Sequence, residues 1–329
     1  MYDEVVALIS DAKRILVVQA ENPDGDSLGS ALALEELLGD IDKEVQMYCP
    51  VDIPKYLRYF TGWDRVSSEF DTKCDLVIIV DTSADILLTK VLETPGVRHF
   101  LESHPVLVID HHTTKSTLTF NHVALFEDAI STSEVIFRLA RSASWHINQQ
   151  AAEHLLGAQL ADSLGLSIQS VTPESYQIAA ELTALGAHVA TIEDRRRQFM
   201  KKSQEILHYK GVLLGRIEYM LDGKLALVHI PWEEIQAYSD QYNPSVLVLD
   251  EMRLVENVEV AVAVKTYPDG KLTGKLRSNV PISEQIAGYF GGGGHPYAAG
   301  FRVYENYDTV VRELVTATAK AMDSANETS

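Results

Sequence analysis

The first half of the chain alternates short apolar runs with segments of helical periodicity. Four runs contain four or five mostly apolar residues each, at positions 15–18, 45–48, 76–80 and 106–109. Runs this short and continuous are typical of parallel strands that are buried on both faces. Between the first two runs, residues 27–38 place apolar side chains at helical spacing. This pattern predicts an α/β fold whose N-terminal domain contains a doubly wound, mainly parallel sheet.

The second half of the chain begins with helical patterns and then mixes them with strand patterns. Helices are expected over residues 132–140, 149–164, 173–185, 282–290 and 308–322. Strands are expected over residues 225–230, 258–267, 272–277 and 300–304. The sequence Pro-Asp-Gly at residues 268–270 predicts a hairpin between the second and third of these strands. We therefore predict an N-terminal domain over residues 1–190, a helical linker over residues 191–220 and a smaller α/β domain over residues 221–329.

Charge limits the partners of the chain. Its 28 Lys and Arg against 47 Asp and Glu give a formal net charge of −19. This argues against a broad groove for long duplex nucleic acid, because such grooves need cations to neutralise phosphates. A short anionic substrate held by local cations or metals stays open. The five cations within residues 195–202 are either the solvated face of a connecting helix or a basic stripe facing such a substrate.

Cysteine usage and hydropathy indicate the compartment. Cys49 and Cys74 lack metal-type spacing, so we expect no disulfide framework, and a reducing compartment fits. The charged residues of the first turns, among them Asp3 and Glu4, are unlike a secretory signal peptide. We find no run of about 18 apolar residues in the sequence, so no membrane span is expected. The prediction is a cytoplasmic protein.

Acidic residues follow three of the four apolar runs. Asp81 directly follows the third run and Asp110 the fourth, while Asp24 and Asp26 lie a few residues beyond the first. Because ligands collect outside the carboxyl ends of parallel strands, these carboxylates are expected to meet at one edge of the sheet. Gly25 is expected to act as a flexible hinge that lets both neighbouring aspartates point inward.

Each candidate also has an ordinary explanation. Asp26 or Ser27 can cap a helix that starts at Leu28, and Asp81 can be a turn residue at the end of its strand. The adjacent histidines His111 and His112 can be a structural or surface pair.

A further aspartate strengthens the interpretation of these residues as a metal site. Asp162 lies on a helix with an otherwise apolar face, where a carboxylate is costly unless it is paired or liganded. Together the pieces supply five carboxylates and two imidazoles without thiolate, which favours Mn²⁺, with Mg²⁺ or Co²⁺ as alternatives. Two such metals can share one carboxylate and hold a hydroxide for attack on phosphorus.

Six motifs resemble those of a known superfamily. The motifs NPDGDSLGS, VDTSA, DHH and ADSLG begin at residues 22, 80, 110 and 161, and resemble the four motifs of the DHH phosphoesterases. GKLRSN at residue 274 and GGGGHPYAAG at residue 291 resemble the companion DHHA1 domain. The order is the expected one over nearly the whole chain. The layout most resembles the branch of oligoribonucleases that also dephosphorylate 3′-phosphoadenosine 5′-phosphate (pAp).

The resemblance implies a role for each residue of the N-terminal motifs. Asp24 would bind the first of two metals, and Asp81 would bridge both. The second metal would be completed by Asp26, His111 and Asp162. His112 would touch the substrate phosphate or a metal-bound water, and Asp110 would orient a histidine.

The resemblance also makes the C-terminal domain the substrate-binding domain. Its phosphate or terminal-nucleotide contacts, made across an interdomain cleft, would come from Arg277, Ser278, Gly292, Gly293, Gly294 and His295. A glycine run suits this role because it lets the backbone approach an anion closely. The implied substrates are short oligoribonucleotides, linear dinucleotides or pAp, with no membrane partner and with a homodimer left open.

One position departs from the family pattern. The family has a histidine where this chain has Ala20, so the first metal would lose a protein ligand. Gln19 and Glu21 would point to the opposite face of an extended chain. Two alternatives therefore stay beside the phosphoesterase: a pyrophosphatase or polyphosphatase, and a degenerate nucleotide-binding module.

Overall fold

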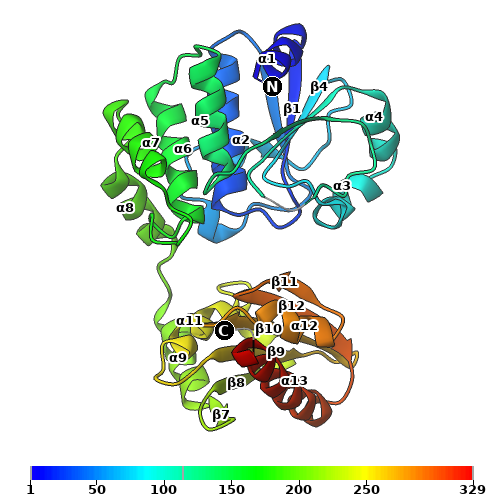
Figure 1. The fold of residues 1–329 in the computed structure, drawn as a ribbon, viewed down its shortest axis with the longest axis vertical. Coiled ribbons are helices and arrows are strands. Elements are labelled where there is room, and N and C mark those ends of the chain that lie inside the picture. Colours follow the sequence, from blue (N-terminus) through cyan, green and yellow to red (C-terminus); the bar gives the residue numbers. More distant parts are fainter. Residues whose placement is uncertain (1, 113–114, 328–329) are drawn as a thin grey trace. The chain divides into compact units, whose positions relative to one another are not determined.

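The chain divides into two compact units. The computed structural model describes residues 2–112 and 115–327, and the units are Met1–Lys201 and Lys202–Ser329. Each unit has its own sheet and its own hydrophobic core (Figure 1). In the part of the chain that is described, we find no helix long and apolar enough to cross a membrane.

The first unit is built on six parallel strands in the order β3-β2-β1-β4-β5-β6. Their bounds are β1 Arg14–Val18, β2 Glu44–Tyr48, β3 Val66–Ser67, β4 Leu76–Val80, β5 Val106–Asp110 and β6 Val123–Phe126. The four predicted runs are all strands, so the expected parallel sheet is confirmed. The strand order reverses between β1 and β4, which is where doubly wound folds bind their ligands.

Helices cover both faces of this sheet. Their bounds are α1 Tyr2–Asp11, α2 Gly25–Gly39, α3 Thr89–Glu93, α4 Val97–Ser103, α5 Thr132–Ser142, α6 Gln149–Asp162, α7 Pro173–Ala184 and α8 Val189–Phe199, with short 3₁₀ turns at Lys55–Leu57, Trp63–Arg65 and Asp85–Leu88. Ile15 and Val17 of β1 pack in one core with α2, α5 and α6, while Leu16 and Val18 pack in another with α3 and α4. This alternation explains why residues 15–18 of the strand are all apolar.

The start of α2 differs from the expectation. The helix begins at Gly25, and its N-cap is Asp24, whose carboxylate accepts from the backbone N–H groups of Asp26 and Ser27. Asp26 and Ser27 are therefore helical residues and not caps of a helix that starts at Leu28. Gly25 is also helical, so it is not a hinge.

The predicted linker region, residues 191–220, contains most of α8 in the first unit and all of α9 in the second. α8 ends at Phe199, and α9 spans Gln204–Gly215. The arginines of α8 are neutralised locally, since Arg195 pairs with Glu153, Arg196 with Glu193 and Arg197 with Asp194. These pairs favour the solvated-helix interpretation over a basic stripe.

The second unit has a mixed sheet in the order β11-β12-β10-β9-β8-β7. Its strands are β7 Glu218–Met220, β8 Leu225–Ile230, β9 Val260–Thr266, β10 Lys271–Ser278, β11 Gly293–His295 and β12 Ala298–Tyr304. Its further helices are α10 Trp232–Tyr238, α11 Pro244–Arg253, α12 Ser283–Tyr289 and α13 Tyr307–Glu327. The predicted hairpin is confirmed as the antiparallel pair β9–β10. α12 and α13 cover one face, and α11 packs on the other.

Candidate active site

Asp26 lies where two helices begin. It is the second residue of α2, and its carboxylate accepts hydrogen bonds from the backbone N–H groups of Thr132 and Ser133 at 2.6 and 3.1 Å. Thr132 is the first residue of α5, whose N-cap is Ser131. Free N–H groups and the positive end of a helix dipole favour a carboxylate at such a position. The starts of the two helices therefore hold Asp26 in place, although it is buried.

His111 directs one ring nitrogen at three carboxylates. Its Nδ1 donates to the carbonyl oxygen of Ala129 at 3.0 Å, which leaves the lone pair of a neutral ring on Nε2. The distances from Nε2 are 3.5 Å to Asp162, 3.6 Å to Asp81 and 4.0 Å to Asp26. A histidine whose second nitrogen is fixed by a backbone carbonyl is the usual form of a metal ligand.

Asp81 has a strained backbone. It directly follows β4, is 8% exposed and has φ 61°, in the left-handed region. Its carboxylate accepts a hydrogen bond from the Thr132 hydroxyl at 3.0 Å. A non-glycine residue in a sparsely populated backbone conformation costs roughly 1–3 kcal/mol and is found most often at functional sites.

Asp110 and His112 form a close pair. The carboxylate of Asp110 accepts from Nδ1 of His112 at 2.6 Å and from its backbone N–H at 3.1 Å. Burial alone would raise the pKa of Asp110, but the bonds from His112 outweigh burial and lower it. The bond to Asp110 raises the pKa of His112, although burial opposes this. Asp110 thus orients His112 and stabilises its protonated form.

The remaining carboxylates repel one another. Burial, followed by the charge of Asp24, raises the pKa of Asp26 to about 6. Burial and then Asp26 raise the pKa of Asp162 to about 7, and the same two causes raise the pKa of Asp81 well above its usual range. A bound cation reverses such shifts because it stabilises the ionised carboxylates.

Two groups of three residues bring their ligand atoms within 4.8 Å of one another. They are Asp81 with His111 and His112, and Asp26 with His111 and Asp162. Carboxylates and imidazoles without a thiolate are ligands for Mn²⁺, Mg²⁺ and related divalent ions. The donor set and its mutual repulsion therefore fit a divalent metal centre.

Asp24 and Ala20 are the positions that the resemblance assigns to the first of the two metals, and Asp24 belongs to neither of these two groups. Asp24 is exposed, and the carboxylate oxygen that caps α2 accepts two backbone N–H bonds, at 3.0 and 2.9 Å. Ala20 is buried, and its carbonyl accepts from the thiol of Cys49 at 3.5 Å. Glu21 accepts the backbone N–H of Lys90, and Gln19 is fully buried without a side-chain partner among the described residues.

The candidate residues of the second unit lie on β10 and on the segment through β11. The guanidinium of Arg277 donates to its neighbour's carbonyl and forms no ion pair with a described residue. Ser278 is buried, and its hydroxyl is bonded to the carbonyl of Val280 and the hydroxyl of Ser283. The side chain of His295 lies outside the described part of the structure.

The last three glycines of the run differ in their surroundings. A Cβ on Gly292 would lie 2.2 Å from the carbonyl oxygen of Gly300, and one on Gly294 would lie 2.6 Å from that of Ala298. A Cβ on Gly293 would meet no described atom within 4 Å. Close packing against β12 therefore explains Gly292 and Gly294 without a ligand.

Thr132 is a site residue that sequence reasoning missed. It is fully buried and joins two carboxylates, binding Asp26 through its N–H and Asp81 through its hydroxyl. The signal was present in the sequence, because Ser131-Thr132-Ser133-Glu134 has the pattern of a helix capping box. A helix that starts with free N–H groups after the DHH motif is a place where a buried acid can bind.

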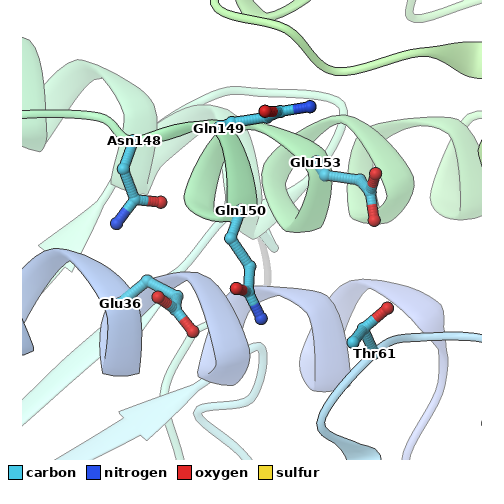
Figure 2. Close-up of a pocket in the computed structure, with 6 residues that line it drawn as sticks. All are labelled: Glu36, Thr61, Asn148, Gln149, Gln150 and Glu153. Carbon is cyan, nitrogen blue, oxygen red and sulfur yellow. The ribbon is translucent and has the colours of Figure 1, made fainter.

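A polar hollow of about 450 Å³ lies elsewhere in this unit. Figure 2 shows its lining residues, Glu36, Thr61, Asn148, Gln149, Gln150 and Glu153. Glu36 lies ten residues after Asp26 on α2, which corresponds to about 15 Å along the helix axis. Because its lining comes from the far end of α2, the start of α6 and the loop residue Thr61, this hollow does not belong to the acidic site.

Comparison with known proteins agrees with this geometry. Residues 14–168 match the DHH family, N-terminal domain. This part of the chain is therefore similar to that domain. Its fold places the DHH motif itself, Asp110 to His112, at the carboxyl end of β5 beside the other acids.

Several known proteins are similar to the chain over most of its length. It is 28% identical over 311 residues to the bifunctional oligoribonuclease and PAP phosphatase NrnA of Thermus thermophilus, covering 92% of this chain and 90% of that protein. It is 21% identical to the protein of the same name from Bacillus subtilis, covering 96% and 98%. The fold resembles an exopolyphosphatase-related protein from Bacteroides fragilis, with a TM-score of 0.86, 24% identity and coverage of 97% and 95%.

Proposed function

We propose that this protein is a metal-dependent phosphoesterase of the DHH family and that it hydrolyses short oligoribonucleotides, linear dinucleotides and pAp. The observation that carries the proposal is the convergence of Asp26, Asp81, Asp162 and His111, with the pKa of all three carboxyls raised by burial and mutual repulsion. The names of the relatives from Thermus thermophilus and Bacillus subtilis support this substrate class.

The acidic site would hold two Mn²⁺ ions. Asp26, His111 and Asp162 would bind one and Asp24 the other, with Asp81 shared. When bound, such ions neutralise phosphate charge and make a coordinated water more acidic. Asp110 holds His112 and raises its pKa, which favours the protonated ring that could donate a proton to a phosphate oxygen. The strained Asp81 backbone and the bond from Thr132 fix the shared carboxylate before substrate arrives.

A cationic face of the second unit supports the choice of a phosphorylated substrate. Lys265 of β9 and Lys275 and Arg277 of β10 lie on the face of the sheet opposite Leu276. Among the described residues, none of these three cations forms an ion pair. Burial and the neighbouring Lys275 lower the pKa of Lys265 to about 8, and burial and Arg277 lower the pKa of Lys275. An anion bound at Arg277 would relieve this repulsion.

The negative charge of the whole chain favours short substrates. A net charge of −19 repels the extended backbone of a long nucleic acid, since affinity there comes from many phosphate contacts. One or two phosphates can be held by the local cations and metals instead. We therefore propose selectivity for the shortest substrates.

The proposal is tested with a substrate panel. The protein is loaded with Mn²⁺ and incubated with 5′-labelled di- to pentaribonucleotides, pAp and pyrophosphate, and the products are separated by chromatography. We expect the protein to turn over the nucleotides. Chelation of the metal should abolish this turnover. Faster release of phosphate from pyrophosphate would instead favour a pyrophosphatase, and nucleotide binding without turnover would favour a degenerate module.

Asp81→Asn is the variant that should lose activity without losing the fold. Asparagine tolerates the left-handed backbone and can keep the bond from Thr132, so the chain should fold while turnover is abolished. Asp42→Asn is the control, because Asp42 is an exposed aspartate with the same φ of 61°. Turnover by Asp81→Asn at the wild-type rate would place the active site elsewhere.

A further inference from the structure

A second hollow of the first unit adjoins the acidic site. It has a volume of about 610 Å³, and we call it the Tyr56 groove. Its lining includes Tyr56, Tyr59, Leu160 and Leu164. It is separate from the polar hollow of Figure 2, with which it shares no lining residue.

The groove adjoins the acidic site from two sides. Asp24 and Gly25 line it at the start of α2, and the next residue along the chain is Asp26. Ala161 lines it at the end of α6, and the next residue is Asp162. A molecule whose phosphate lies at the acidic site can therefore place its adjoining part in the groove.

Much of the lining of the groove is apolar and aromatic, beside the charged residues Asp24, Glu193 and Arg196. Leu164 is 68% exposed and Tyr56 is 49% exposed, although exposing such side chains to water is unfavourable. Inorganic phosphate or pyrophosphate has nothing to place against them. A nucleobase does, because its flat apolar faces stack on aromatic rings and pack on aliphatic side chains.

The loop that carries Leu164 is strained and held in place. Leu164, Gly165 and Leu166 have φ angles of 51°, 75° and 63°, a conformation that is unfavourable for the two leucines. Ser163 fixes the loop, since its hydroxyl donates to the carbonyl of Gln159 at 2.6 Å and accepts from the N–H of Leu166 at 2.9 Å. Strain that the surrounding bonds maintain is a mark of a functional position.

We propose that the Tyr56 groove binds the nucleobase of the nucleotide whose phosphate lies at the acidic site. The base packs against the Tyr56 ring and the Leu164 side chain. The groove thus selects nucleotides over base-free phosphate compounds. This inference rests on the proposed function, because it needs a phosphate bound beside Asp26 and Asp162.

The test compares substrates with and without bases. Tyr56→Ala and Leu164→Ala are assayed with a ribodinucleotide and with an analogue that carries hydrogen in place of each base. We expect kcat/KM for the dinucleotide to fall roughly tenfold, as for the loss of one base-stacking contact, and kcat/KM for the analogue to stay unchanged. Tyr56→Phe, which keeps the ring, should retain the activity.

Two exposed residues of the second unit provide the controls. Tyr219→Ala removes a tyrosine that is 48% exposed, and Leu254→Ala removes a leucine that is 78% exposed. Neither should change kcat/KM. Equal losses on both substrates, or no loss on either, would overturn the groove assignment. A change in the sedimentation of Tyr56→Ala would assign the groove to contact with a second copy instead.

Calorimetry separates this inference from the proposed function. The wild-type protein should bind AMP more tightly than ribose 5-phosphate, and Tyr56→Ala should remove the difference. If the wild-type protein hydrolyses neither the ribodinucleotide nor its base-free analogue, the proposed function fails. The difference in affinity between AMP and ribose 5-phosphate still decides whether the groove holds a base. Equal affinities of the wild-type protein for both ligands would overturn the groove.

Discussion

Gly25 of α2 lies so close to Ala161 of α6 that no side chain fits between them. A Cβ atom on Gly25 would be 2.4 Å from the Cβ of Ala161. One turn further along α2, a Cβ on Gly29 would be 2.8 Å from the Cβ of Ala158. The two helices can approach each other only because these positions are small, and their approach brings Asp26 and Asp162 to the same site.

We predict that Gly25→Ala separates these two helices. Overpacking of a close contact costs roughly 1–3 kcal/mol in the free energy of unfolding. We also expect weaker Mn²⁺ binding, because Asp26 and Asp162 follow the two residues that are pushed apart. Denaturant unfolding and calorimetric Mn²⁺ titration measure the two effects.

Gly39→Ala is the matched control at the other end of α2. A Cβ there would meet no described atom within 4 Å, and alanine is favoured over glycine in a helix by roughly 0.5–1 kcal/mol. We expect unchanged metal binding and a small gain in stability. Equal effects of the two substitutions would mean that the contact with Ala161 does not position the acids.

Ala20→His tests the position that departs from the family pattern. Ala20 is 6% exposed, so an imidazole there should lower the free energy of unfolding of the chelator-treated protein by roughly 1–3 kcal/mol. If the ring supplies the ligand that the family has, Mn²⁺ should raise the melting temperature of the variant more than that of the wild type. Thermal unfolding with and without Mn²⁺ measures both.

Ala20→Leu distinguishes added bulk from an added ligand. Leucine has a similar size but no nitrogen, so it should lose stability without gaining a response to Mn²⁺. A weaker response of Ala20→His than of the wild type would show that alanine belongs to a repacked site.

His154 gives a pH-dependent prediction for the core behind the site. It is 1% exposed on α6, its Nε2 has no partner among the described residues, and burial lowers its pKa to about 3. The folded protein therefore favours the neutral ring, whereas the unfolded chain can take up the proton. The contribution of the neutral ring to the free energy of unfolding is fully present above pH 6.5 and is lost as the pH falls toward 3. At pH 5 the loss is roughly 2 kcal/mol relative to neutral pH.

His154→Leu should remove this acid sensitivity. Urea unfolding from pH 7 to pH 4 measures the free energies of unfolding of the variant and the wild type. As the pH falls, the variant should become more stable relative to the wild type. His146→Leu, at a histidine whose side chain is 77% exposed, is the matched control. A difference for His154→Leu that does not change with pH would contradict a buried neutral ring.

The sequence allowed much of the site to be predicted because parallel strands end at one edge. Asp81 and Asp110 follow buried apolar runs, so their meeting follows from strand direction alone. The contact of Asp162 with His111 could not be predicted from strand direction, because it depends on how α6 packs on α2. The small residues that permit this packing have no distinct local pattern, and Gly25 was for that reason interpreted wrongly as a hinge.

Other elements were missed for physical reasons that differ. β3 has only two residues, too few to show any periodicity, and β6 is mostly half-buried. The role of Thr132 depends on a backbone N–H group, which every residue but proline has. The strain at Asp81 and Leu164 could not be predicted either, since these residue types usually adopt negative φ angles.

The strain at Leu164 leads to a last prediction, which sets stability against activity. Glycine adopts φ 51° without strain, whereas a bulkier residue there costs roughly 1–2 kcal/mol. Part of this is offset, because glycine loses more conformational freedom on folding. Since Leu164 is 68% exposed, little burial is lost, and Leu164→Gly should raise the free energy of unfolding by roughly 0.5–1 kcal/mol.

The same substitution should lower kcat/KM for dinucleotides, because it removes a side chain against which the base packs. Leu254→Gly is the control, since Leu254 is an exposed leucine with φ −85°, where glycine relieves no strain and should lower stability. Urea unfolding and the dinucleotide assay are measured on the same preparations. If both variants lose stability alike, the leucine at residue 164 is not strained. If Leu164→Gly is more stable and fully active, the strain serves a purpose other than binding the base.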